Sequence, residues 1–167
     1  MRLFKRLLLV GLSITLLVGC DLTSKKIAET ELKNQPVKAY LNGGLQFVYA
    51  ENEGGMLSFG GDLSETTRII IFQVFVGAML ALFLAYFIKK KNSGRLETLA
   101  FVLFFSGGLG NLFSRITHDG RVVDFMIIEL SGYHTGIFNV ADVYIMLSMA
   151  LLIFLLIISP GKARRVI

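Results

Sequence analysis

The chain has 167 residues, of which 54% are hydrophobic and 17% are charged, and its net charge is +5. An average soluble domain is roughly 45–50% apolar and about 25% charged, whereas the mean hydropathy here is +0.66. This composition excludes a disordered chain and a collagen-like chain, and the single cysteine excludes an internal disulfide. We predict one integral membrane domain over residues 1–167.

The apolar residues lie in four long runs. Ile69–Ile88 has Gln73 as its only strongly polar side chain, and about 20 apolar residues cross a hydrocarbon core roughly 30 Å thick. The first run, Leu7–Cys20, is short for a span, but the apolar Leu3 and Phe4 precede it. The predicted membrane spans are about 4–20, 69–88, 97–114 and 140–159.

Lys and Arg gather on one side of this topology. The N-terminal tail, the loop Lys89–Glu97 and the tail Lys162–Ile167 hold 10 of the 17 basic residues and 1 of the 12 acidic ones, so this side carries +9 and the other side −4. Such a bias in short loops is typical of the cytoplasmic side of a membrane protein. We therefore predict a multi-pass protein with both termini cytoplasmic. We predict no nucleic-acid binding, since no basic face carries interleaved aromatic side chains.

Two segments, 21–68 and 115–139, then lie on the extracytoplasmic side. The first contains Leu45–Tyr49, an alternating run with aromatic side chains, flanked by Asn42-Gly43-Gly44 and Gly54-Gly55. This pattern is typical of a strand between turns. The predicted fold class is an all-α membrane protein: four transmembrane helices with a small extracytoplasmic β-sheet region.

Asp124 and Asp142 are acidic residues next to apolar segments. Asp142 stands at the entrance of the last apolar run, and Asp124 follows two β-branched residues. A carboxylate beside hydrocarbon is costly and tends to mark a functional site. Taken alone, however, Asp142 also fits a helix-capping acid and Asp124 a solvated loop acid. Because both flank one outer loop they can meet, and a close pair can share a proton, activate water and bind the carbonyl oxygen of an amide.

Further polar and small residues precede the same outer loop. Asn111 and Arg115 are four positions apart and lie on one side of a helix. Before them, Gly107, Gly108 and Gly110 allow close approach of a neighbouring helix or of a lipidic substrate. The simpler interpretation of these glycines is a packing face between helices.

The first outer segment contributes two further pairs of polar or turn-forming residues. Asp21 and Lys25 are four positions apart just after the first run, which fits an ion pair on a helix. Asn52 and Gly54 fit a turn. Neither pair alone distinguishes a functional site from ordinary structure.

Several other classes of site have no support in the sequence. His118 and His134 have no second ligand at metal-binding spacing, and no nucleophilic serine motif, phosphate loop or dinucleotide fingerprint occurs. A transporter or channel is disfavoured because the acids stand at one interface and not at the midplane.

Five short blocks occur in order along most of the chain: Asp21-Leu22-Thr23-Ser24-Lys25, Asn52-Glu53-Gly54, Gly107–Arg115, Val122-Val123-Asp124-Phe125 and Phe138–Asp142. Each block alone is a weak signal. Together, in this order and with four spans, they make the chain resemble the lipoprotein signal peptidase family, the type II signal peptidases.

The resemblance implies an aspartyl endopeptidase of the bacterial inner membrane. It would cleave prolipoproteins that carry a diacylglyceryl group on the lipobox cysteine, on the amino side of that cysteine. Asp124 and Asp142 would be the catalytic pair at the extracytoplasmic interface. The implied partners are the lipidated prolipoproteins and membrane lipid; no metal or organic cofactor is implied, and we expect a monomer. The residues that would bind substrate or support the site are Asn52, Gly54, Gly108, Asn111, Arg115, Asn139, Asp21 and Lys25.

The chain departs from the family pattern at two places. Ser114 stands where the family usually has an Asp before the Arg, which removes an ion-pair partner for Arg115. The stretch Gly54-Gly55-Met56-Leu57 replaces small residues followed by an aromatic. We therefore expect a divergent member that keeps both presumed catalytic Asp residues.

The N-terminus allows a competing interpretation. Leu17-Val18-Gly19-Cys20 follows a basic and then an apolar stretch, as in the signal peptide of a lipoprotein. Acylation of Cys20 and removal of residues 1–19 would leave three spans, and the chain would then be a non-catalytic membrane lipoprotein or assembly factor that kept the fold. We favour an uncleaved first span, because the Asp21–Lys25 block follows where that span should exit. Otherwise Cys20 is a small apolar side chain.

Overall fold

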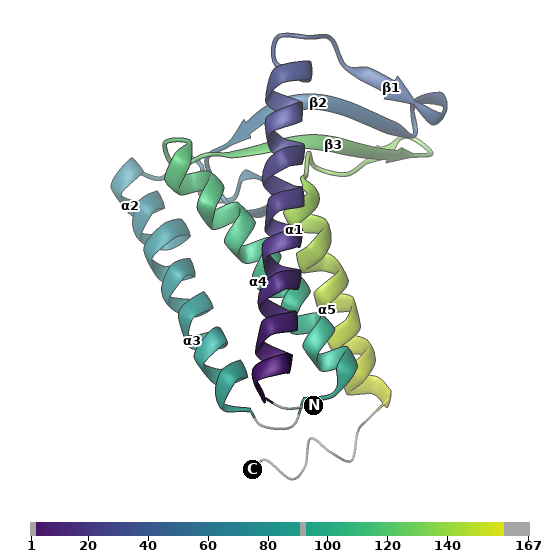
Figure 1. Ribbon diagram of the computed structural model, residues 1–167. Helices are drawn as coiled ribbons and strands as arrows, with labels where there is room; N and C mark the ends of the chain where they lie inside the picture. Colours follow the sequence, from purple (N-terminus) through teal and green to yellow (C-terminus); the bar gives the residue numbers. More distant parts are fainter. Residues whose placement is uncertain (1–2, 91–92, 159–167) are drawn as a thin grey trace.

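The computed structural model describes residues 3–90 and 93–158, and it consists of long helices with a small sheet at one end (Figure 1). Within these residues, four helical segments are long and apolar enough to cross a membrane. The helices are α1 (Leu3–Leu32), α2 (Glu65–Ile69), α3 (Val76–Lys89), α4 (Arg95–Thr117) and α5 (Val140–Ile158), and a π-helical stretch, Ile70–Phe75, links α2 to α3. The strands are β1 (Lys38–Tyr40), β2 (Leu45–Asn52), β3 (Val122–Leu130) and β4 (Tyr133–His134), and single 3₁₀ turns occupy Leu41–Gly43 and Met56–Ser58.

The first helix is longer than the predicted first span. That span was expected to end near Cys20, but α1 continues to Leu32. The charges of Asp21 and Lys25 do not end the helix, because they pair inside it, with 2.7 Å between Lys25 Nζ and Asp21 Oδ2. The expected end of the fourth span, at Ser159, lies outside the described residues. Where the membrane boundaries fall along these helices stays a prediction.

The two predicted outer segments meet in one antiparallel sheet of order β1-β2-β3-β4. β2 contains the predicted strand Leu45–Tyr49, and it pairs with β3, which contains the block Val122–Phe125. The register shifts between Phe47 and Ala50, and Ala50 then pairs with Asp124. Four apolar helices with a small sheet confirm the predicted fold class.

Two apolar clusters hold the helices and the sheet together. The first joins α1, α3 and α4 through Val10, Leu80, Phe87, Phe101, Val102 and Phe105. The second joins the end of α1 to β3 through Ala28, Leu32, Val123 and Phe125. Because α1 contributes to both clusters, it fixes the sheet relative to the helices.

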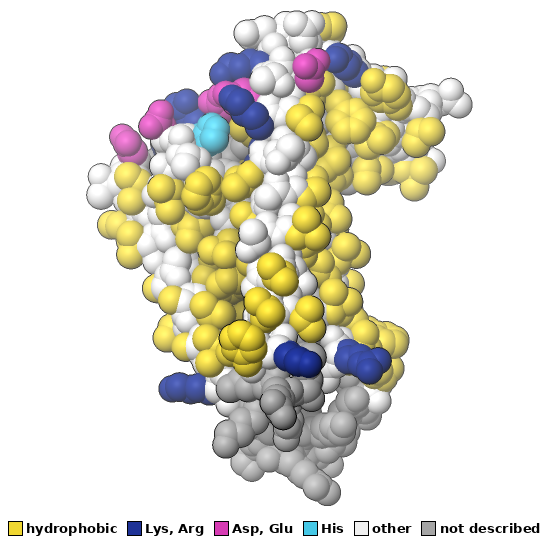
Figure 2. Space-filling model, in the orientation of Figure 1, with side chains coloured by type: hydrophobic (Ala, Val, Ile, Leu, Met, Phe, Trp, Pro, Cys, Tyr) yellow, Lys and Arg dark blue, Asp and Glu magenta, His cyan; other side chains and the backbone are white. Residues whose placement is uncertain are grey.

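Large apolar side chains cover the middle of the molecule and charged side chains gather at its two ends (Figure 2). Leu16 is 73% exposed, Leu82 is 66% exposed and Ile157 is 70% exposed. Soluble monomers rarely expose apolar patches this extensive, whereas helices in lipid do so along their whole outer surface. We call the end with the sheet the sheet end. The opposite end is the basic end, and its described basic residues are Lys5, Arg6, Lys89, Lys90 and Arg95.

The glycines of α4 lie at close helix contacts. A Cβ added at Gly107 would lie 2.5 Å from the carbonyl oxygen of Ala141 on α5, and one at Gly110 would overlap the carboxylate of Asp21. The structure therefore supports the interpretation of these two glycines as a packing face, which leaves no room beside them for a lipidic substrate.

Replacing Gly107 with Ala is expected to lower the free energy of unfolding by about 1–3 kcal/mol, because the Ala141 carbonyl can yield only if α5 shifts. The matched control is Gly77→Ala, whose Cβ would make an ordinary 3.7 Å contact with Leu112. That variant should be neutral or more stable by up to about 1 kcal/mol, since Ala favours helix. Thermal unfolding in detergent micelles measures both, and equal melting temperatures would contradict the close contact.

Candidate active site

Asp124 and Asp142 come from two elements that meet at the sheet end. Asp124 lies on β3 and is 3% exposed, while Asp142 lies in the first turn of α5. A short bridge holds the chain before α5 against β3: the Met126 N–H donates to the Phe138 oxygen, and the Phe138 N–H donates to the Met126 oxygen, both at 2.9 Å. The bridge brings the two acids into one site although the rest of the outer loop separates them in sequence.

Asn139 connects the two carboxylates directly. Its Nδ2 donates to Asp124 Oδ1 at 2.6 Å, and its backbone N–H donates to Asp142 Oδ2 at 3.0 Å. The Asp142 N–H donates in return to Asn139 Oδ1 at 3.1 Å, which is the reciprocal pattern of a helix capping box. Asp142 is therefore a capping acid and a neighbour of Asp124 at the same time.

The end of β2 approaches Asp124 from another side. Asn52 Nδ2 donates to Asp124 Oδ2 at 2.9 Å, and Asn52 Oδ1 accepts from the Gly54 N–H at 2.9 Å. Arg115 on α4 donates to the Gly54 carbonyl oxygen, and its guanidinium lies 5.4 Å from the centre of the Phe72 ring. Gly54 and Arg115 thus position the turn that follows Asn52.

A second chain of contacts leads from α1 to Asp142. Asn111 Nδ2 donates to Asp142 Oδ1 at 2.9 Å, and Asn111 Oδ1 accepts from Lys25 Nζ at 2.9 Å. Lys25 Nζ also donates to Asp21 Oδ2, and Asp21 Oδ1 accepts from the Ala141 N–H at 2.9 Å. Because an ammonium group only donates, Lys25 holds the oxygen of Asn111 towards α1 and so directs its amide NH₂ at Asp142.

Burial dominates the electrostatics of Asp124. Removal from water raises the pKa of this carboxyl above its ordinary value, and the charge of Asp142 raises it further. The hydrogen bonds from Asn52 and Asn139 lower the pKa in part, but the net direction is upward. A carboxyl that keeps its proton to higher pH, beside a second carboxylate, is the arrangement of a pair that shares one proton.

One predicted site residue lies away from the carboxylates. Gly108 faces the other side of α4, where a Cβ would meet the side chain of Leu80 on α3. Conversely, Phe72 and the backbone N–H of Ala141 contact site residues although the sequence analysis gave them no role. Phe72 is one of many apolar residues in its run, and a backbone donor leaves no mark in the residue type. The only signal for Ala141 was its place in the block that ends at Asp142.

The structure also shows the surroundings of Ser114 and Cys20, the two positions at which the sequence raised a question. Ser114 is buried and its Oγ donates to the Gly110 oxygen at 2.9 Å, so Arg115 takes the Gly54 carbonyl as its partner where the family pattern would offer a carboxylate. Cys20 is exposed on a continuous α1, and Val10 upstream of it belongs to the core. The segment before Cys20 is therefore part of the folded bundle.

Comparison with known proteins decides the family. A model of the family described as Signal peptidase (SPase) II matches residues 13–158. The chain belongs to the signal peptidase II family. A lipoprotein signal peptidase from Yersinia enterocolitica is 34% identical over 88% of this chain and 85% of its own length. Another, from Chlorobium phaeobacteroides, is 35% identical over 83% of this chain and 84% of its own length.

Solved structures share the fold of this chain. One, described as a bacterial membrane enzyme, has a TM-score of 0.79 and 26% identity and covers 92% of this chain and 90% of its own. A second with the same description has a TM-score of 0.74 and 29% identity, over 88% and 91%. The chain is thus a peptidase and a multi-pass bacterial membrane protein, and the predicted resemblance is confirmed. The alternative of a non-catalytic lipoprotein or assembly factor gains no support.

Proposed function

We propose that this chain is an aspartic endopeptidase that uses Asp124 and Asp142 to remove signal peptides from diacylglyceryl-modified prolipoproteins, with the cut on the amino side of the lipobox cysteine. The observation that carries the proposal is the position of Asn139, which hydrogen-bonds both carboxylates and so holds them as a pair. Relatives named lipoprotein signal peptidase, aligned over most of the chain, support the choice of substrate.

In the proposed mechanism the pair holds one proton, which resides on Asp124 because burial raises the pKa of that carboxyl. Asp142 is the base of the pair and lies in the first turn of α5, where the helix dipole stabilises negative charge. Asp142 takes a proton from water as the water oxygen bonds to the scissile carbonyl carbon, and Asp124 gives its proton to the carbonyl oxygen. Asp142 then protonates the leaving nitrogen, the C–N bond breaks, and a hydroxyl of the intermediate returns a proton to Asp124.

The depth of the pair suits a substrate anchored by acyl chains. Asp142 lies in the first turn of α5, an otherwise apolar helix that begins at the sheet end (Figure 1). Acyl chains in the lipid would hold the scissile bond near the same interface. With the basic end in the cytoplasm, we place the site at the extracytoplasmic interface and both termini inside. We further propose a monomer that acts without a metal or organic cofactor.

Complementation tests the proposal in cells. A bacterial strain depleted of its own lipoprotein signal peptidase should regain growth and prolipoprotein processing when it expresses this chain. A full-length, membrane-inserted chain that restores neither would contradict the proposed function.

The cleavage rate should fall as pH rises through the pKa of Asp124. The mechanism requires the protonated carboxyl; a raised pKa keeps the proton to higher pH than in a free Asp, and above that pKa the proton is lost. Asn52 lowers this pKa by its hydrogen bond, so Asn52→Ala should raise the pKa and move the alkaline limb of the rate profile to higher pH.

Gln46→Ala is the matched control for this pH profile. Gln46 lies on the same strand, but its amide donates to Glu129 and to the Gly43 oxygen and not to Asp124. Its profile should match that of the unmodified chain. An alkaline limb that moves to lower pH in Asn52→Ala, or by the same amount in both variants, would contradict the assignment of the proton to Asp124.

A further inference from the structure

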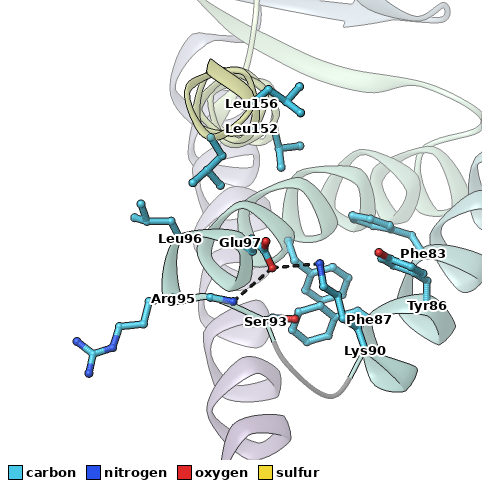
Figure 3. A pocket seen from close by; sticks show the side chains of 13 residues that line it. Phe83, Tyr86, Phe87, Lys90, Ser93, Arg95, Leu96, Glu97, Leu152 and Leu156 are labelled. Carbon is cyan, nitrogen blue, oxygen red and sulfur yellow. Dashed lines mark hydrogen bonds and ion pairs between the residues drawn. The ribbon is translucent and has the colours of Figure 1, made fainter. Parts of the chain in front are cut away.

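A cavity of about 610 Å³ lies at the basic end of the bundle, far from the paired carboxylates. Its volume lies in the range of small-molecule pockets, roughly 300–1,000 Å³. The walls come from α3, α4 and α5 and from the residues just before α4, and both α3 and α5 pack on α4. Figure 3 shows Leu152 and Leu156 of α5 on one side, and Phe83 and Tyr86 of α3 on the other. The proposed peptidase mechanism makes no use of this space.

The interior of the cavity is aromatic and aliphatic. Phe87 stacks on Phe101 with ring centroids 3.8 Å apart, and Phe83 packs against Phe101 at 5.0 Å. Leu152 and Leu156 are 36% and 66% exposed, so the cavity opens to the outer surface of the helices. In a membrane that surface faces lipid, and a hydrocarbon chain can enter the gap between α3 and α5 without crossing water.

Among the described residues, Lys90 and Glu97 form an ion pair at the mouth of the cavity. Lys90 Nζ lies 3.1 Å from Glu97 Oε2, and the two side chains are 35% and 45% exposed. Glu97 Oε2 also accepts a hydrogen bond from the Gly94 N–H at 3.3 Å. Figure 3 shows the side chain of Arg95 extending away from this pair. A headgroup at this mouth therefore meets both signs of charge.

The charges at the mouth select among membrane lipids. Lys90 can bind the phosphate that glycerophospholipids share. A headgroup with a net negative charge would also lie against the Glu97 carboxylate, whereas a headgroup that carries a primary ammonium can pair with it. Lys90 follows directly after α3, which ends at the basic end. Lys and Arg side chains gather at this end (Figure 2), and such residues mark the level at which phospholipid headgroups lie.

We propose that this cavity is a binding site for a glycerophospholipid with a primary ammonium headgroup, from the leaflet at the basic end. One acyl chain lies between α3 and α5, the phosphate contacts Lys90 and the ammonium contacts Glu97. Basic pockets between membrane helices on the cytoplasmic side are known to bind the phosphates of lipid headgroups.

Native mass spectrometry of the full-length chain in detergent tests the site, with phosphatidylethanolamine and phosphatidylglycerol as the two probes. The unmodified chain should retain phosphatidylethanolamine in preference to phosphatidylglycerol. Lys90→Ala should weaken this retention about tenfold, because one charge-assisted hydrogen bond is lost. The matched control is Lys89→Ala, which removes the neighbouring exposed charge that does not line the cavity and should leave retention unchanged.

A second pair of variants tests whether the apolar interior of the cavity holds the lipid. Leu155→Trp places a large ring inside the cavity and should abolish lipid retention. Ile153→Trp adds the same ring at a 53% exposed position outside the cavity and should leave lipid retention unchanged. Equal loss in both members of either pair would overturn the site, because it would indicate ordinary surface lipid. Preferential, Lys90-dependent retention of phosphatidylglycerol would overturn the headgroup assignment. A dimer that retains no lipid would also overturn the proposal, because it would assign the cavity to a second copy of the chain.

Discussion

Either single substitution, Asp124→Asn or Asp142→Asn, is expected to reduce cleavage of a lipidated prolipoprotein by roughly 10²- to 10⁴-fold, the usual contribution of general acid–base catalysis. Asp124→Asn keeps an oxygen for Asn139 or Asn52 but cannot hold the catalytic proton. Asp142→Asn keeps the helix cap in part but cannot accept a proton from water. Time courses with purified protein and a gel-resolved substrate measure the rates.

Asp119→Asn is the matched control for these two variants, because Asp119 is exposed in the turn between α4 and β3. It should cleave at the rate of the unmodified chain. All three variants should keep nearly the same melting temperature, so that lost activity reports lost chemistry. A folded Asp124→Asn or Asp142→Asn variant that cleaves at the unmodified rate would contradict the catalytic pair.

Lys25→Leu is expected to lower the free energy of unfolding by about 3–5 kcal/mol, the typical effect of removing one partner of a buried ion pair. Asp21 is 0% exposed and would lose the 2.7 Å contact to Lys25 Nζ, so its buried carboxyl group would have no cation beside it. Asn111 would also lose the donor that orients its amide towards Asp142. Thermal unfolding in detergent measures the loss of stability, and residual cleavage of the folded fraction measures the effect on the site.

The neighbouring pair of Lys26 with Glu29 provides the control for Lys25→Leu. The Lys26 side chain is 70% exposed and lies 2.9 Å from Glu29, so Lys26→Leu should change stability by less than about 1 kcal/mol. The double variant Asp21→Asn with Lys25→Leu should recover part of the loss, since no buried charge remains. Equal melting temperatures of Lys25→Leu and Lys26→Leu would contradict a structural role for the buried pair.

Local pattern was enough to predict the four helices and the strand in β2. Each of these elements can be predicted from one short segment alone: the helices from apolar runs near 20 residues long, and the strand from an alternating aromatic run flanked by glycines. The continuation of α1 beyond the predicted first span was not part of the prediction, and the reason is physical. Asp21 and Lys25 resemble the polar boundary of a span, but their charges neutralise each other within the helix, and α1 continues to Leu32.

The candidate site depends on contacts between distant parts of the chain, which local pattern does not contain. Asn52 contacts Asp124 only because β2 pairs with β3. Arg115 on α4 contacts Gly54 only because the loop between β2 and α2, which contains Gly54, lies beside α4. Asn139 could be placed near Asp142 from its spacing, but its bond to Asp124 requires the bridge before α5. Gly108 shares a motif with site residues and yet faces α3, because successive residues of a helix point in different directions.

The most direct test of the central claim is cleavage by the purified chain of one prolipoprotein prepared in two forms, with and without the diacylglyceryl group on its lipobox cysteine. Mass spectrometry of the products locates the cut. We predict that the lipidated form is cleaved on the amino side of the modified cysteine and that the unmodified form is left intact. Failure to cleave the lipidated form, or cleavage that persists when Asp124 and Asp142 are both replaced by Asn, would contradict the account.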